Sequence, residues 1–113
     1  EHHYIRSFDE RGLRVGDAYF NSSVVISADQ LIVWPVTNME QLSPDFLEPI
    51  LKLDPEVVLF GTGQTQVFLP PDMMVPFYRN AIGFEVMKTE AACRTFNVLV
   101  SEGRRVAAAL VIG

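Results

Sequence analysis

The sequence is poor in the residue types on which disulfide-stabilised proteins and metal sites depend. It contains one cysteine, Cys93, which excludes an internal disulfide and is typical of proteins from a reducing compartment. Its two histidines, His2 and His3, are neighbours at the N-terminal end, and a metal site would need further ligands beside them. No apolar run approaches the roughly 18 residues that a membrane-spanning helix requires. We therefore expect no metal, no cofactor and no insertion into a membrane.

Positive charge is also scarce. The 14 Asp and Glu residues outnumber the 9 Lys and Arg residues, so the formal net charge is −5, and a phosphate backbone would be repelled on average. Nucleic-acid binding is therefore not expected. Apolar residues make up 49% of the chain and charged residues 20%, which is typical of a globular protein with one core. We expect a single cytoplasmic domain over residues 1–113, in which residues 1–8 form a loosely held end or an edge strand.

Three apolar runs in the second half of the chain predict the fold class. Val57–Phe60 stops at a glycine turn, Phe84–Met87 follows a helical stretch, and Val106–Ile112 has no charged residue. Such runs fit strands that are covered on both faces of a partly parallel sheet. Helices are expected between them, at about Asp72–Ala81 and from a capping Thr89 to about Glu102. The prediction is an α/β domain with a mixed, partly parallel sheet and two to three helices.

The first half of the chain predicts β-hairpins and one more helix. Two strand pairs are expected around tight turns: Leu13–Val15 with Ala18–Phe20, and Val24–Ile26 with Leu31–Trp34. Ser43 and Pro44 predict a helix start, with a capping hydroxyl followed by proline at the first helical position. Pro49 should shorten or bend that helix. After the glycine turn, Gln66–Leu69 is expected to be a short extended piece.

One candidate binding site lies where the Val57–Phe60 run ends. The Gly61-Thr62-Gly63 turn lacks the third glycine and the immediately following helix of a dinucleotide-binding loop, and it has no Walker lysine. The glycines are best explained by backbone angles that side chains disfavour, but the turn's amides could also bind a small anion. Polar residues of the last helix would face this turn near the carboxyl ends of the strands, where α/β sheets bind ligands. The candidate pocket comprises Gly61, Thr62, Gly63, Thr89, Cys93, Arg94 and Asn97.

Each polar residue of this pocket also has a structural explanation. Cys93 lies near a helix N-terminus beside Arg94, where a lowered pKa would make it a nucleophile, but a lone cysteine on an apolar helix is more often a small buried hydrophobe. Arg94 could bind an anion, although pairing with Glu85 or Glu90 is favoured. No catalytic constellation emerges, so no catalytic residue is assigned and an enzyme activity is not favoured.

Apolar bulk is concentrated around residues 68–78, and core packing is its default explanation. So short a segment cannot turn every one of these side chains inward, and methionine and aromatic residues suit interfaces. Part of the set is therefore expected to form a partner surface. The candidates are Phe68, Met73, Met74, Phe77 and Tyr78.

With these segments in place, the chain resembles a small α/β family of unknown biochemical activity. The stretches that carry the resemblance are Val57–Gly63, Leu69-Pro70-Pro71, Gly83–Met87, Thr89–Asn97 and Glu102–Leu110. The family contains bacterial and archaeal single-domain proteins, the mitochondrial complex I assembly factor 3 and the adipogenesis-associated domain proteins. The Cys93–Asn97 stretch is similar to the proteobacterial branch.

The resemblance implies a compact α/β fold with a hammerhead-like β element before the helices, and a monomer or weak homodimer. It implies no established enzyme activity, and it carries over no catalytic residues. The mitochondrial members act by binding other proteins during assembly of a membrane complex. The leading hypothesis is thus a non-catalytic interaction or assembly module with a protein partner. The alternative is a small-molecule or anion-binding protein, or an enzyme, that uses the pocket between the Gly61–Gly63 turn and the Thr89–Asn97 helix.

Overall fold

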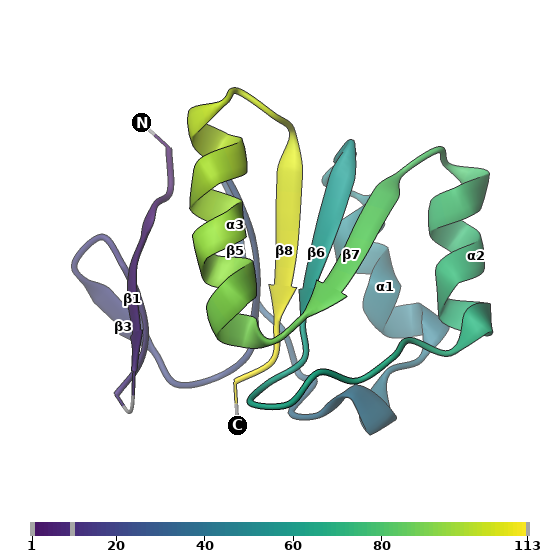
Figure 1. Ribbon diagram of the computed structural model, residues 1–113, viewed down its shortest axis with the longest axis horizontal. Coiled ribbons are helices and arrows are strands. Elements are labelled where there is room, and N and C mark those ends of the chain that lie inside the picture. The colour runs from purple at the N-terminus through teal and green to yellow at the C-terminus, as the bar shows by residue number, and fades with distance from the viewer. Residues whose placement is uncertain (1, 10, 113) are drawn as a thin grey trace.

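The computed structural model describes residues 2–9 and 11–112 and arranges them in two sheets, with helices around the larger one (Figure 1). The elements in chain order are β1 (Ile5–Asp9), β2 (Gly12–Val15), β3 (Ala18–Phe20), β4 (Val24–Ser27), β5 (Leu31–Val33), a short 3₁₀ helix η1 (Met39–Gln41), α1 (Pro44–Leu51), β6 (Val57–Gly61), α2 (Pro71–Arg79), β7 (Gly83–Met87), α3 (Thr89–Ser101) and β8 (Val106–Leu110). The small sheet and α3 lie at one end of the molecule, and α1 and α2 lie at the other (Figure 1).

The larger sheet has the strand order β5-β4-β8-β6-β7. Strand β6 pairs in parallel with β7 and with β8, whereas β4 pairs antiparallel with β5 and β8. The three apolar runs of the second half of the chain therefore lie side by side in one mixed sheet, which confirms the predicted α/β class. Every residue of β6 and β8 is buried, as expected for strands covered on both faces.

Two hydrophobic clusters cover the two faces of this sheet. Val58 and Phe60 of β6 face the cluster that contains α1 and α2. Val57 and Leu59, which alternate with them, face the cluster that contains α3 and the small sheet. Both clusters therefore depend on the same central strand.

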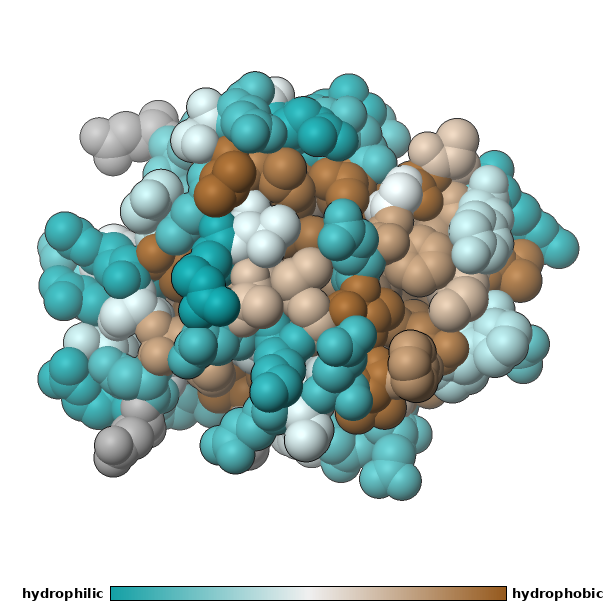
Figure 2. Space-filling view, in the orientation of Figure 1, coloured by the Kyte–Doolittle hydropathy of each residue, from teal (hydrophilic) through white to brown (hydrophobic). Residues whose placement is uncertain are grey.

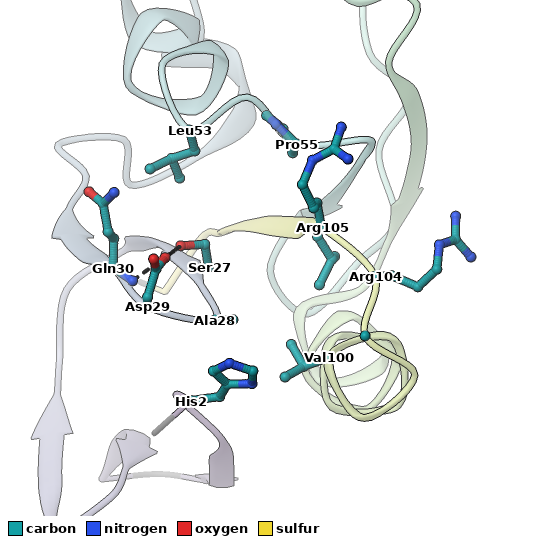
Figure 3. Close-up of a pocket in the computed structure, with 12 residues that line it drawn as sticks. His2, Ser27, Ala28, Asp29, Gln30, Leu53, Pro55, Val100, Arg104 and Arg105 are labelled. Atoms are coloured by element: carbon teal, nitrogen blue, oxygen red, sulfur yellow. Dashed lines mark hydrogen bonds between the residues drawn. The ribbon is translucent and has the colours of Figure 1, made fainter.

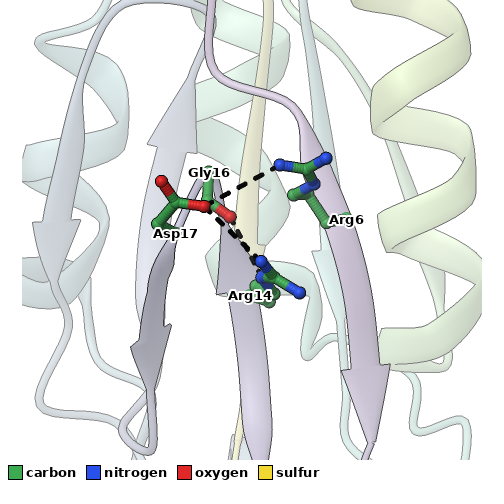
Figure 4. Close-up of polar contacts among 4 residues, drawn as sticks. All are labelled: Arg6, Arg14, Gly16 and Asp17. Atoms are coloured by element: carbon green, nitrogen blue, oxygen red, sulfur yellow. Dashed lines mark hydrogen bonds and ion pairs between the residues drawn. The ribbon is translucent and has the colours of Figure 1, made fainter.

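The small sheet is antiparallel with the order β1-β2-β3, and it is the β element that precedes the helices. Residues 5–8, expected in a loosely held end or an edge strand, lie in its edge strand β1. At the β2–β3 turn, the Asp17 carboxylate lies 4.0 Å from the guanidinium of Arg6 and 3.5 Å from that of Arg14 (Figure 4). Arg6 and Asp17 are well exposed and Arg14 is half-buried, so these surface ion pairs contribute little to stability.

The caps of two helices and one loop differ from the sequence predictions. Helix α1 begins at Pro44 as predicted and contains Pro49, but the Ser43 side chain makes no capping hydrogen bond. Thr89 is the first residue of α3 and not its cap, which is Lys88. Residues 66–69 form no strand, and the Gln66 side-chain amide instead donates to the Val86 carbonyl at 3.1 Å.

Candidate functional site

The polar groups of the Gly61–Gly63 turn are bonded within the chain. The Thr62 hydroxyl donates to the carbonyl of Thr65 at 2.6 Å, and the Thr62 N–H donates to the carbonyl of Met87 at 2.9 Å. Gly63 has a φ of 96°, the left-handed region that glycine adopts without strain. The backbone explanation of the glycines thus fits the geometry, and the Thr62 amide is not available to an anion.

Thr89 closes the space between this turn and α3. Its hydroxyl accepts a hydrogen bond from the Gly63 N–H and donates one to the Val111 carbonyl, both at 2.8 Å, and its side chain is fully buried. A Cβ on Gly61 would lie 2.9 Å from the Thr89 Cα, which is closer than real Cβ atoms approach. The junction between the turn and the helix is therefore filled by protein atoms.

The other candidate pocket residues of α3 also serve the fold. Burial raises the pKa of the Cys93 thiol to about 12, so the side chain is a protonated thiol and not an activated nucleophile. Arg94 pairs with Glu90 at 3.0 Å on the surface, one of the structural pairings considered above. The Asn97 amide accepts from the Ile5 N–H at 2.9 Å and donates to the Ile5 carbonyl at 2.8 Å, so it fixes β1 to α3.

A shallow hollow of about 430 Å³ lies outside this junction. Its lining residues are Phe8, Asp9, Gly63, Gln64, Lys88 and Glu90. Of the seven candidate pocket residues, Gly63 alone lines it. Asp9 is not among the residues predicted for this site, because β1 is distant in the chain and no local pattern indicates that its end lies beside the glycine turn.

A second hollow of about 340 Å³ lies at the opposite end of the sheet, between the β4–β5 turn and the start of β8 (Figure 3). Two of its polar side chains are engaged with the protein: the Ser27 hydroxyl donates to Asp29 at 3.1 Å, and Arg104 pairs with Glu56 at 3.4 Å. Hydrogen bonding from the Arg105 backbone N–H, together with Arg104, lowers the pKa of Glu56. The Arg104 side chain points away from His2 and Asp29 (Figure 3).

Among the described residues, neither hollow assembles a metal site. Over residues 2–9 and 11–112, no three His, Cys, Asp or Glu side chains are grouped so that they could hold a metal ion. Within the same described part of the chain, no helix has both the length and the apolar character needed to cross a bilayer.

The candidate partner surface separates into core and exposed residues. Met73 and Phe77 are buried in the hydrophobic core, where the Phe77 ring packs edge-on against Phe60 at a centroid distance of 5.6 Å. These two residues are therefore not part of an exposed surface, which corrects their assignment. Their i, i+4 spacing on α2 places them on one helix face, and this signal was present in the sequence. Met74 is half-buried.

Phe68 and Tyr78 are the exposed aromatic residues of that set, with 86% and 68% of their surface accessible. The Tyr78 ring lies 5.6 Å from the ring of Phe84, which is half-buried on β7 next to the half-buried Val86. The loop that carries Phe68 is tied to β7 by the Gln66–Val86 hydrogen bond. We call Phe68, Tyr78, Phe84 and Val86 the β7 patch. Hydrophobic surface is visible on the right of the molecule in Figure 2, where Figure 1 places β7 and α2.

The fold and the site together define a small α/β domain whose polar junctions are satisfied internally and whose distinctive surface is apolar. Comparison with known families identifies it further. The chain belongs to the family described as a protein of unknown function (DUF498/DUF598), whose sequence profile matches residues 5–111. The resemblance inferred from the sequence is thereby confirmed.

Curated relatives with two different names are similar to this chain. The "13 kDa major membrane protein" of Francisella tularensis is 27% identical over 101 residues, which cover 88% of this chain and 80% of the relative. The NADH dehydrogenase (ubiquinone) 1 alpha subcomplex assembly factor 3 of mouse is 32% identical over 96% of this chain, and that of zebrafish (Danio rerio) is 33% identical over 95%. The chain spans about 60% of the length of these assembly factors.

Solved structures share the whole fold. A crystal structure of a Bordetella parapertussis protein superposes with a TM-score of 0.93 at 31% identity. The superposition covers 99% of this chain and 97% of the Bordetella chain. An NMR structure of a Xanthomonas campestris protein gives a TM-score of 0.88 at 39% identity, with 98% and 85% coverage. A Bartonella henselae structure described as an outer membrane protein gives 0.89 at 30% identity, with 98% and 95% coverage.

Proposed function

We propose that this chain is a protein-binding module that assists the assembly of a larger complex, and that it is not an enzyme. The observation that carries the proposal is that two aromatic side chains, Phe68 on the loop before α2 and Tyr78 near the end of α2, have 86% and 68% of their surface in water. Such side chains bury a large area when a partner covers them, and aromatic residues dominate the binding energy of many interfaces. A contiguous exposed apolar surface on a small protein is typical of an interaction site.

Two further observations support the proposal. Thr62, Thr89, Cys93 and Asn97 are occupied by packing or internal hydrogen bonds, so the pocket on which the small-molecule alternative depends has no free polar group among them. The animal relatives are named as assembly factors of NADH dehydrogenase (ubiquinone), and the match covers nearly all of this chain.

The partner is accordingly another protein. The net charge of −5 disfavours nucleic acid. A monomeric or weakly dimeric state stays a prediction. A cytoplasmic location also stays a prediction, because two relatives carry names that refer to a membrane.

The test is photo-crosslinking in the native host with p-benzoylphenylalanine in place of Phe68. The expected result is one reproducible adduct, identified by mass spectrometry. The matched control carries the same group in place of Val98, which is also exposed but lies on α3 at the other end of the molecule. Adducts that do not differ between the two positions would contradict the proposal.

A second arm measures binding without the probe. The double variant Phe68→Ser/Tyr78→Ser should reduce recovery of that partner at least about tenfold, as expected for aromatic anchors. Val98→Ser should leave recovery unchanged, and all variants should melt near the parent temperature because the altered side chains are exposed. Unchanged recovery with the double variant would overturn the proposal.

A further inference from the structure

Strand β7 is the end strand of the larger sheet, and its pairing fixes which backbone groups face outward. The Gly83 N–H donates to the Glu56 carbonyl, and the Met87 carbonyl accepts from the Thr62 N–H. In a parallel ladder, alternate residues bond to the same neighbour. Residues 83, 85 and 87 therefore bond toward β6, and the backbone groups of Phe84 and Val86 face away from the sheet.

This outward edge is largely unpaired. The Val86 carbonyl accepts from the Gln66 side chain at 3.1 Å. For the N–H and C=O of Phe84 and the N–H of Val86, no hydrogen-bond partner occurs among the residues that the structure describes. Natural proteins usually protect such an edge with charge, proline or a covering segment, since it is a template for pairing with another chain.

We propose that the partner of this module contributes an extended strand that pairs antiparallel with β7. This inference rests on the proposed function and specifies how the partner is held. A residue opposite Phe84 and one opposite Val86 would each exchange two backbone hydrogen bonds with β7. An extended segment is the occupant because free donors and acceptors recur at every second residue of β7, which is the spacing that a strand presents.

The side chains around the edge specify the chemistry of that strand. Phe84 and Val86 pack against the cluster that contains α1 and α2, so partner residues opposite them would lie over the β7 patch and should be apolar. Glu85, between them, is exposed and points to the other face of the sheet. Among the described residues it makes no ion pair, so a basic partner residue would complement it. The partner strand should therefore read apolar, basic, apolar.

A second copy of this chain fits the edge less well. The symmetric register that places Phe84 opposite Val86 of the other copy also places Glu85 directly opposite Glu85. Like charges directly opposite each other on a strand pair are destabilising. The complementary occupant is thus a strand of a different protein.

The test uses the full isotope-labelled chain and the synthetic peptide acetyl-Thr-Val-Lys-Val-Thr-amide. NMR titration should shift the amide signals of Phe84 and Val86, and hydrogen exchange of these two amides should slow. The matched control peptide is N-methylated at both valines, which keeps the side chains but removes the paired donors. It should bind at least about tenfold more weakly. Equal binding of the two peptides, or no change at the two amides, would overturn the inference.

Gln66 provides an independent variant. Because its side chain occupies the Val86 carbonyl, an incoming strand must displace or share it. Gln66→Ala should therefore strengthen binding of the unmethylated peptide by about threefold, the equivalent of one modest hydrogen bond. Weaker binding would show that Gln66 contacts the peptide and does not protect the edge, which contradicts this part of the inference.

Failure of strand addition is distinguishable from failure of the proposed function. Val86→Pro removes the outward N–H and leaves the ladder with β6 intact, whereas Val86→Ala keeps that N–H. If both variants retain the adduct formed at position 68, protein binding stands and strand addition is wrong. If Val86→Pro alone loses this adduct while its melting temperature is unchanged, the result supports strand addition. If Val86→Pro does not fold, the comparison of the two peptides decides.

Discussion

Thr89 is buried where three segments meet: the turn after β6, the start of α3 and the residues that follow β8. Its single hydroxyl bonds to Gly63 on one segment and to Val111 on another, and its backbone N–H donates to the Gly63 carbonyl at 3.0 Å. Gly61 belongs to the same junction, because the strand can approach the helix this closely only without a side chain. The polar atoms at this end of the sheet thus stabilise the fold.

Replacing Thr89 with valine tests that role. The variant keeps the shape of the side chain but leaves the Gly63 N–H and the buried Val111 carbonyl without their partner. An unsatisfied buried group costs about 1–3 kcal/mol, so Thr89→Val should lower the free energy of unfolding by about 2 kcal/mol or more. Thr89→Ser retains both hydrogen bonds and should lose less, about 1 kcal/mol for one methyl group. Urea denaturation compares them, and equal stability of the two variants would contradict the assigned role.

Cys93 gives the protein a specific sensitivity to alkaline pH. Burial raises the pKa of its thiol from the ordinary value of 9.0 to about 12. Below pH 9 the thiol is protonated in both the folded and the unfolded state. Between pH 9 and about 12 the unfolded chain releases this proton while the folded chain retains it, so stability falls as pH rises.

The variant Cys93→Ala isolates this effect. Its free energy of unfolding is expected to be lower than that of the parent at neutral pH, because a buried group is removed. Above pH 9 the gap should narrow by about 1 kcal/mol for each pH unit, since only the parent carries this thiol. Guanidinium unfolding over a pH series measures the gap, and a constant difference would argue against a buried, protonated thiol.

At the scale of elements, α3 supplies hydrogen-bond partners to the outer edge of strand β1. The Asn97 amide bonds to both backbone groups of Ile5, as a neighbouring strand would. Removing it with Asn97→Ala should raise hydrogen exchange at the Ile5 amide about tenfold or more, because the donor loses its acceptor. Exchange at Leu59 in β6 should not change. The control is Val98→Ala, at the neighbouring exposed residue, which should change hydrogen exchange at neither the Ile5 nor the Leu59 amide.

The elements themselves were largely predictable because their signals are local. Apolar runs predicted β6, β7 and β8, and the helices expected between these runs, α2 and α3, lie within a few residues of their predicted ends. The roles of the candidate site residues were not predictable in the same way. Thr89 bonds to a residue 22 positions away and Asn97 to one 92 positions away. Polar residues that hold distant segments together have the same local appearance as polar residues that bind a ligand.

At the scale of the whole molecule, the two hydrophobic clusters lie on opposite faces of one sheet. Alternate residues of β6 and β8 belong to different clusters, so neither face can be disordered without loosening the strands that the other uses. The small sheet contributes Ile5, Leu13 and Val15 to the cluster with α3. We therefore expect the small sheet to unfold together with the rest of the domain in one transition.

Leu13→Ala tests this coupling from one face while Trp34 reports from the other. Leu13 is fully buried in the cluster with α3, and its truncation should cost about 2–5 kcal/mol. Trp34, the single tryptophan, is buried in the opposite cluster, where its indole N–H donates to the Phe46 carbonyl at 2.9 Å. If the clusters are coupled, the fluorescence transition of Trp34 and the far-UV circular dichroism transition should shift together to lower denaturant concentration.

The control variant is Tyr19→Ala, on the outer face of the small sheet, where Arg11 and Arg14 lie over the Tyr19 ring. This substitution should lower the free energy of unfolding by less than about 1 kcal/mol. Early loss of β-structure with an unchanged Trp34 transition would mean that the small sheet unfolds alone, and the shared sheet would then not unite the two faces.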